Sequence, residues 1–472
     1  MHEWLKAAFL IPFHLVVAPT AGLLIRSSRK WQQVVFFLLM FFTVYDYTRI
    51  SMSPWFPDPL YRGHTRGYEC TILEVLAIVL IFANVGVPGR IRGPWFPPGL
   101  FLWLAYCFAG LLSIVNSENA SYTMMAFVKF TKAALVFIGA FHFFREEKDI
   151  RFWLRSVAVI LIFQGFVCVV QKYYYHIHQV TGWFEHQNAM VMYTYLLALP
   201  LLSAAMSSHI SQRDTITTVA GFVFGGISAV MALSRVGLLA FTAGAIIVVV
   251  LGLMERMSTK RLALIGSMGL LALLGGLLVA DSVIGRFRDS GNVQSEMTRE
   301  LLNKSSREML HDHLILGIGW NNYGIVINPP YHYGDTLDEY ARSIGRRRYV
   351  DSEFGKPISE SWYYLILAET GWLGMTTCLV FILTLLFWTG RAAWRFRHTL
   401  PGSVAAGIFV GTGLNYLQSG FERVLTQPKN IAAWMICLGL VSRLEWRRRQ
   451  ARRAAALPPR SSNPVSRKSG ML

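Results

Sequence analysis

The sequence predicts an all-α, polytopic integral membrane protein with one large loop outside the membrane. Hydrophobic residues make up 53% of the 472 residues and charged residues only 15%, whereas soluble domains carry about 25% charged residues. The apolar residues gather in runs that approach the roughly 20 residues needed for a membrane-spanning helix. A mostly polar segment from Asp281 to Glu360 separates the first ten or so runs from the last ones.

The apolar runs predict about 12 or 13 transmembrane helices. Pro12, His14 and Pro19 interrupt the first run, and the last run is short. No small-residue cleavage site follows the first run before the next one begins, so we do not expect a signal peptide. The spans are expected near 8–25, 31–46, 71–88, 96–115, 121–144, 152–172, 188–208, 216–233, 236–254, 262–280, 361–390, 401–418 and 430–443.

The basic residues indicate the orientation of these spans. Residues 443–472 contain nine Lys or Arg and one acidic residue, so the positive-inside rule places the C-terminus in the cytoplasm. The large loop carries ten Lys or Arg and eleven Asp or Glu between 281 and 357, and it falls on the outer side. Counting back puts every short basic loop inside: 26–30, 88–95, 145–151, 255–261 and 391–400. The other outer segments are 47–70, 116–120, 173–187, 234–235 and 419–429.

We expect a single membrane domain over residues 1–453, with the loop 281–360 inside it. The tail 454–472 is rich in Pro, Ser and Arg and is predicted to be disordered. The net charge is +18, and Arg-rich ends beside a last span favour contacts with anionic membrane lipids over nucleic acid. The five cysteines show neither metal-ligand spacing nor a disulfide framework. His311, Asp312 and His313 are spaced too tightly for zinc, so no metal site is expected.

Within the large loop, residues 294–315 are predicted to form a helix. Apolar residues recur there at roughly helical spacing, with charged residues between them. The glycines of GIGWNNYG (317–324) then predict a turn. Residues 325–357 have no clear period.

Two arginines are candidates for binding a phosphate group. Arg235 lies in ALSRVGLLA between two apolar runs, where an ionisable side chain is costly and indicates a function. Arg307 lies in NKSSREMLHDH on the predicted loop helix. Two guanidinium groups at the outer surface would suit a pyrophosphate, because each matches phosphate oxygens in a bidentate fork. The alternatives are a snorkelling arginine at 235 and a solvated helix face at 307. The run 346–348 is a weaker candidate of the same kind.

Polar residues at the outer ends of two other spans are also candidates. Glu185, His186, Gln187 and Asn188 in WFEHQNAMVMY suit a sugar or a lipid headgroup, and ordinary capping of the interface is the alternative. In PISESWYYLILAETGWLG, Glu360 could act as a general base, because partial burial raises the pKa of a carboxyl group. Lys129 and Lys132, within the span 121–144, could line a transport path or meet a carrier phosphate.

The order of these motifs resembles the O-antigen ligase and polysaccharide polymerase superfamily of bacterial envelopes. The resemblance covers roughly residues 180–380: the span-edge EHQN, the SRxG arginine, the SSR helix followed by DH, the GxGxxN turn and the AExG re-entry. It implies a metal-independent glycosyltransferase of the inner membrane that needs no cofactor. The implied donor is a glycan on undecaprenyl diphosphate, and the implied acceptor is a lipid A core or another lipid-linked glycan, in O-antigen or exopolysaccharide biosynthesis.

The resemblance also implies roles for individual residues. The two arginines held to be important in the family map onto Arg235 and Arg307, and the family histidine maps onto Glu360. A carboxylate at that position can also deprotonate an acceptor hydroxyl. Further candidates for substrate binding, together with the residues 185–188, are Asn321, Asn322 and Glu369. A membrane transporter or an export-machine subunit for polysaccharide is the alternative, although transporters usually place polar groups near mid-membrane on broken helices.

Overall fold

The structure is a computed structural model that describes residues 8, 11–45, 63–65, 67–85, 93–255, 257–270, 291–345 and 357–456, without the side chains of 291–295. Within these ranges the regular structure is helical, apart from a single bridge position at Cys70. Six of the helices are long and apolar enough to cross a membrane. The predicted all-α polytopic fold is therefore confirmed.

The first part of the chain, up to Tyr173, forms both short and long apolar helices. These are η1 (Phe13–Val17), α2 (Ala18–Ile25), α3 (Arg29–Phe42), α4 (Ile72–Phe82), α5 (Leu100–Leu112), η2 (Ser113–Asn116), α6 (Ala120–Phe143) and α7 (Glu147–Tyr173). The middle of the chain forms α8 (Gln187–Met206), α9 (Gln212–Met231) and α10 (Arg235–Glu255), and residues 259–270 are also helical. The predicted span 262–280 lies partly outside the described residues, so the total number of spans stays a prediction.

The remainder of the chain supplies the loop helices and the last membrane helices. The loop forms α12 (Gly291–Asp312), α13 (Tyr323–Val326) and α14 (Asp335–Ser343). The last helices are α15 (Trp362–Arg395), α16 (Leu400–Gln418) and α17 (Pro428–Ala456), with η3 (Val424–Thr426) before α17. Helix α12 covers most of the predicted helix 294–315, which confirms that prediction.

Helix α8 occupies the centre of the membrane part. Every residue from Asn188 to Met206 is buried, which fits its apolar character on all sides, because a helix that is hydrophobic all round belongs in a core. Its neighbours are α9, α10 and α16. The outer end of α8 is thereby fixed among other helix ends, where polar side chains become available.

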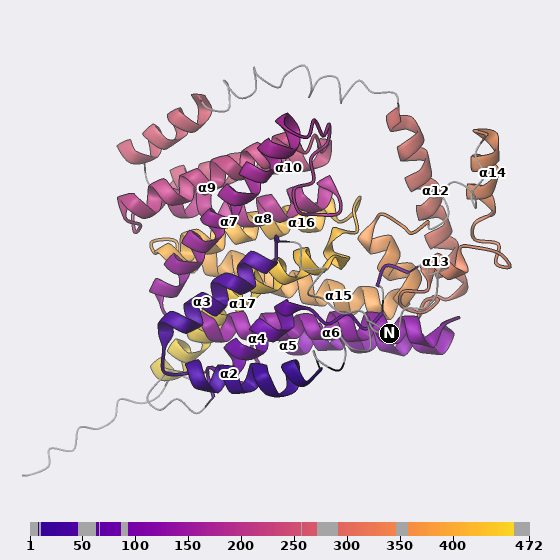
Figure 1. The fold of residues 1–472 in the computed structure, drawn as a ribbon, viewed down its shortest axis with the longest axis horizontal. Coiled ribbons are helices and arrows are strands. Elements are labelled where there is room, and N and C mark those ends of the chain that lie inside the picture. The colour runs from indigo at the N-terminus through magenta and orange to yellow at the C-terminus, as the bar shows by residue number, and fades with distance from the viewer. Residues whose placement is uncertain are drawn as a thin grey trace, which may run out of the picture.

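Contacts between distant segments show that the predicted outer segments share one face. Asn119 lies against Asn322, His64 against Asn321, and Lys429 against the carbonyl of Trp183. The loop helices α12, α13 and α14 lie at that end of the helices, on the right in Figure 1. At the other end, Arg29 pairs with Asp149 and Arg155 pairs with Asp214. The assignment of these faces to outside and inside rests on loop charge and stays a prediction.

Candidate functional site

A break in α15 joins this helix to the turn that follows α12. Gly371 has φ 61° and ψ −164°, a conformation that L-residues rarely adopt. The break leaves backbone groups of α15 without partners in the helix, and the turn supplies them. Ile318 N donates to Ala368 O at 2.9 Å, and Gly319 N donates to Glu369 O at 3.1 Å. In return, Trp372 N and Leu373 N donate to the carbonyls of Leu314 and Ile315 at 3.0 and 3.1 Å.

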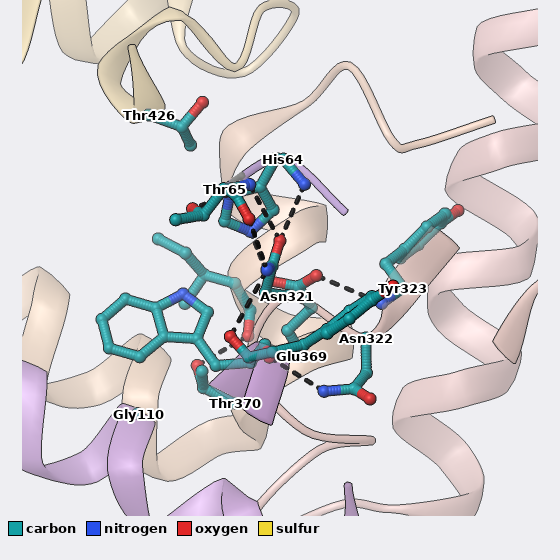
Figure 2. Close-up of polar contacts among 12 residues, drawn as sticks. His64, Thr65, Gly110, Asn321, Asn322, Tyr323, Glu369, Thr370 and Thr426 are labelled. Carbon is teal, nitrogen blue, oxygen red and sulfur yellow. Dashed lines mark hydrogen bonds and ion pairs between the residues drawn. The ribbon is translucent and has the colours of Figure 1, made fainter. Parts of the chain in front are cut away.

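The Glu369 carboxylate fixes the same junction from its interior. One oxygen accepts from Tyr323 N at 3.2 Å, and the other lies 3.0 Å from His64 Nε2. Asn321 has φ 65°, and its side-chain oxygen accepts from His64 N at 2.7 Å and Thr65 N at 3.0 Å. Figure 2 shows these contacts converging between the turn and the segment that carries His64. A segment more than 250 residues away in the chain is thus held against the turn.

Asn322 ties the turn to the start of α6. Its oxygen accepts from Asn119 N at 2.8 Å, and its amide nitrogen donates to Thr123 Oγ1 at 3.2 Å. Asn321, Asn322 and Glu369 are all buried, and their polar atoms bind the protein itself. The structure therefore shows a positioning role for these residues, and the substrate contact predicted for them stays a prediction.

Four elements bring together a group of polar side chains that we call the charged cluster: Arg299, Glu360, Glu422 and Asn188. Arg299 Nε forms a close ion pair with Glu360 Oε2, and Arg299 Nη2 lies 3.1 Å from Glu422 Oε1. The amide nitrogen of Asn188 donates to the same Glu422 oxygen. The residues come from α12, the segment before α15, the segment after α16 and the start of α8. One guanidinium therefore bridges two carboxylates at the predicted outer face.

The two carboxylates of the charged cluster differ in their surroundings. The side chain of Glu360 is 41% exposed and that of Glu422 only 11%. Burial raises the pKa of Glu422 to about 7, although Arg299 and the Asn188 hydrogen bond oppose the shift. Burial by itself would lower the pKa of Arg299, but the charges of Glu360 and Glu422 outweigh it and raise that pKa. A carboxyl group that titrates near neutral pH thus lies beside a permanently charged arginine.

Two further cations, Arg423 and Lys129, lie at the same end of the helices as the charged cluster. Arg423 follows Glu422 directly, and Lys129 donates only a long hydrogen bond of 3.5 Å to the carbonyl of His64. Burial lowers the pKa of Arg423, and four glutamates at longer range counter this effect. Neither Arg423 nor Lys129 forms an ion pair with a residue in the described parts of the chain. Lys129 interacts electrostatically with Glu69, Glu185 and Arg423. Together the two cations offer positive charge that suits an anion.

The other residues predicted from the sequence fall in different surroundings. His186 caps α8, where its ring accepts from Asn188 N at 3.3 Å, and Gln187 contacts Gln179. Glu185 is exposed and reaches Lys129 and Arg423 only through longer-range electrostatics. The arginine run 346–348 lies outside the described residues.

The structure does not bring Arg235 or Arg307 into the charged cluster. Arg235 begins α10 and is half-buried, while Arg307 is exposed on α12. Neither forms a hydrogen bond or an ion pair with a described residue. The arginine of α12 that pairs with Glu360 is Arg299, which lies eight residues before Arg307, or about 12 Å along the helix axis. The catalytic roles of Arg235 and Arg307 stay predictions.

Four residues of these sites were not predicted from the sequence: Arg299, Glu422, Arg423 and His64. For Glu422 and Arg423 a signal existed in the sequence, because FER at 421–423 places two ionisable residues in a short segment between apolar spans. Such residues indicate a function by the same argument that singled out Arg235.

Residues 220–378 match the family model described as O-Antigen ligase. That range holds Arg235, Arg299, Arg307, Glu360 and Glu369, whereas Asn188, Glu422 and Arg423 of the site lie outside it. No match was found among curated proteins.

Proposed function

We propose that this chain, whose residues 220–378 match the family model described as O-Antigen ligase, transfers a glycan from undecaprenyl diphosphate to an acceptor hydroxyl. The reaction takes place at the outer face of the bacterial inner membrane, in O-antigen or exopolysaccharide biosynthesis. The observation that carries the proposal concerns two cations, Arg423 and Lys129, that form no ion pair with a described residue. Arg423 lies close to two carboxylates that share Arg299, and its charge acts on Lys129.

In this proposal the diphosphate of the donor binds at Arg423 and Lys129. A guanidinium offers a bidentate fork to phosphate oxygens and stays charged at any working pH. The acceptor hydroxyl attacks the anomeric carbon of the donor sugar, and the bond from that carbon to the diphosphate oxygen breaks. Negative charge develops on the leaving diphosphate, and fixed cations in a partly buried site stabilise it as the bond lengthens. The charges of these side chains take the place of a metal ion.

The proton of the acceptor hydroxyl passes to a carboxylate of the charged cluster, and we assign this role to Glu422. One oxygen of Glu422 is held by Arg299 and Asn188, and the other receives no hydrogen bond from a described residue. General bases work best when their pKa lies near the working pH, and burial places the pKa of Glu422 at about 7. Glu360, which the sequence analysis predicts as the base, then holds Arg299 in position.

The test of the function is transfer by the purified protein. The protein is placed in lipid nanodiscs with an oligosaccharide linked to undecaprenyl diphosphate and a lipid-linked acceptor glycan, and released undecaprenyl diphosphate is measured. We expect release that depends on the acceptor. A protein that binds the donor but releases no undecaprenyl diphosphate with any acceptor glycan would contradict the proposal and favour a transport or export role.

The pH profile of the same reaction tests the assignment of the base. Glu422 must be ionised to accept a proton, and its raised pKa keeps it protonated at pH 5 to 6. We therefore expect the rate to rise with pH through about 7 and then to level off. Glu422→Gln is expected to remove this rise and to lower the rate by about 100-fold or more. Glu360→Gln serves as the comparison and should keep a rise with pH. The reverse result, in which only Glu360→Gln loses the rise, would assign the proton to Glu360.

A further inference from the structure

A cleft opens beside the proposed site, between α4, α6 and α17; we call it the side cleft. Both α4 and α17 begin next to the middle of α6, so the two helix starts leave a notch against it. Its polar lining includes Glu74, Lys129 and Lys132, and its apolar lining includes Val136 and Ile431. A cleft with one charged wall and one apolar wall suits the headgroup end of an amphiphile.

Two lysines and two glutamates, Glu69 and Glu74, supply the charged groups of the side cleft. Lys129 and Lys132 are three residues apart on α6, so they lie on the same side of the helix. Lys132 Nζ lies 3.4 Å from Glu74 Oε1, and both side chains are largely buried. Lys129 is shared with the proposed diphosphate site, because Arg423 is among the charges that act on it. Lys129 therefore belongs both to the side cleft and to the proposed diphosphate site.

Glu74 has a second set of contacts, and its ion pair with Lys132 is weak. Its other oxygen, Oε2, accepts from the backbone N–H of Thr71, as part of the capping box that begins α4. The contact with Lys132 is longer than a typical charge-assisted hydrogen bond of about 2.7–2.9 Å. Helix starts attract anions, and α17 begins at the rim of the cleft with Pro428. An incoming phosphate can thus compete with Glu74 for Lys132.

We propose that the side cleft binds the phosphate of the donor that carries the polyprenyl chain, with Lys132 as its ligand and Glu74 as a latch. This inference rests on the proposed function. The phosphate next to the sugar then lies at Arg423 and Lys129, and the polyprenyl chain leaves along the apolar wall of the cleft. The side cleft has a volume of about 30 Å³, which is room for about one water molecule. The headgroup therefore enters as Lys132 moves from Glu74 to the phosphate.

The experiment measures binding of undecaprenyl diphosphate, without a glycan, to the full-length protein in nanodiscs. Lys132→Gln is expected to weaken binding about tenfold, because a charged hydrogen bond to phosphate is lost. Glu74→Gln is expected to tighten binding several-fold, because glutamine still serves a capping box but no longer holds a lysine by charge. Lys304→Gln, on the exposed side of α12, is the control and should bind as the wild type does.

The opposite signs of the two effects separate a latch from a purely structural ion pair. If both variants bind more weakly and unfold at a lower temperature, or if Lys132→Gln binds normally, the inference is wrong. Competition by phosphatidylglycerol as strong as by undecaprenyl diphosphate would also overturn it, because the cleft would then hold bulk lipid. The proposed function is tested separately by transfer. If the wild type transfers glycan and Lys132→Gln binds undecaprenyl diphosphate normally, only the proposed subsite is wrong. If the wild type binds undecaprenyl diphosphate through Lys132 but transfers no glycan, only the proposed enzymatic function is wrong.

Discussion

Replacing Arg299 with alanine is expected to lower glycan transfer by about 100-fold or more, with little change in folding. The Arg299 guanidinium bridges Glu360 and Glu422, so its loss leaves two carboxylates near one another without their shared cation. The pKa of Glu422 would then rise further, because a like charge disfavours ionisation, and Glu422 would be protonated at neutral pH. General-base catalysis typically contributes about 100- to 10,000-fold to a rate, so the loss of an ionised Glu422 accounts for the expected decrease. The measurement is release of undecaprenyl diphosphate at saturating donor.

Arg307→Ala is the matched control for this experiment. Arg307 lies on the same helix, has the same charge and is exposed without a partner among the described residues. If the charged cluster is the reaction site, this variant keeps transfer within about twofold of the wild type, as surface substitutions usually do. If instead Arg307→Ala loses activity and Arg299→Ala keeps it, the sequence-based assignment of the loop arginine is right and the charged cluster is not the reaction site.

Gly371→Ala is expected to have the largest effect on stability. A Cβ atom at Gly371 would lie 2.3 Å from Ile315 O, and φ at this residue is +61°. The substitution would push apart the backbone of α15 and the turn, where four hydrogen bonds join them. The positive φ alone costs on the order of 1–3 kcal/mol for a residue with a side chain.

Thermal unfolding and transfer are measured together for this variant. We expect a lower unfolding temperature, because the substitution disturbs the junction between α15 and the turn. We also expect loss of transfer, because Glu369 lies at this junction. Gly413→Ala is the control, since a Cβ there meets nothing within 4 Å and alanine favours a helix more than glycine does. A Gly371→Ala protein with the stability of the wild type would show that the junction is not needed in this form.

The overall fold could be predicted from the sequence because lipid imposes simple rules on it. Long apolar runs must form helices, and Lys and Arg mark one side of them. The segments predicted on the outer side do meet at one end of the structure, although they are scattered from 47 to 429 in the chain. The helix of the large loop was also predictable, because its apolar residues recur at helical spacing.

Two arginines on that helix, Arg299 and Arg307, are candidates for the site. Arg299 lies on the stripe of α12 that contains Leu302, Ser306 and Met309, which are buried. Arg307 follows Ser306 and so points about 100° away from this stripe. The periodicity of the helix therefore predicts that Arg299 lies on the buried stripe, which the family motifs do not indicate. Glu422 and Arg423 are different, because their meeting with Arg299 depends on how α16 and α17 pack against the loop.

The turn residues show a second kind of limit. The sequence predicts a turn at 317–324 and polar side chains within it. It does not indicate that Asn321 and Asn322 bind the backbone near His64 and Asn119, which lie about 200 to 260 residues earlier in the chain. Polar residues near a site can serve its architecture or its substrate, and only the count of satisfied donors and acceptors separates the two roles.

The most direct test of this account is an experimental structure of the protein in nanodiscs with undecaprenyl diphosphate bound. We predict that phosphate oxygens lie within hydrogen-bonding distance of the Arg423 guanidinium and the Lys129 amine, at the face that carries α12. A diphosphate bound at the opposite face, or on the α12 side but away from both cations, would contradict the account.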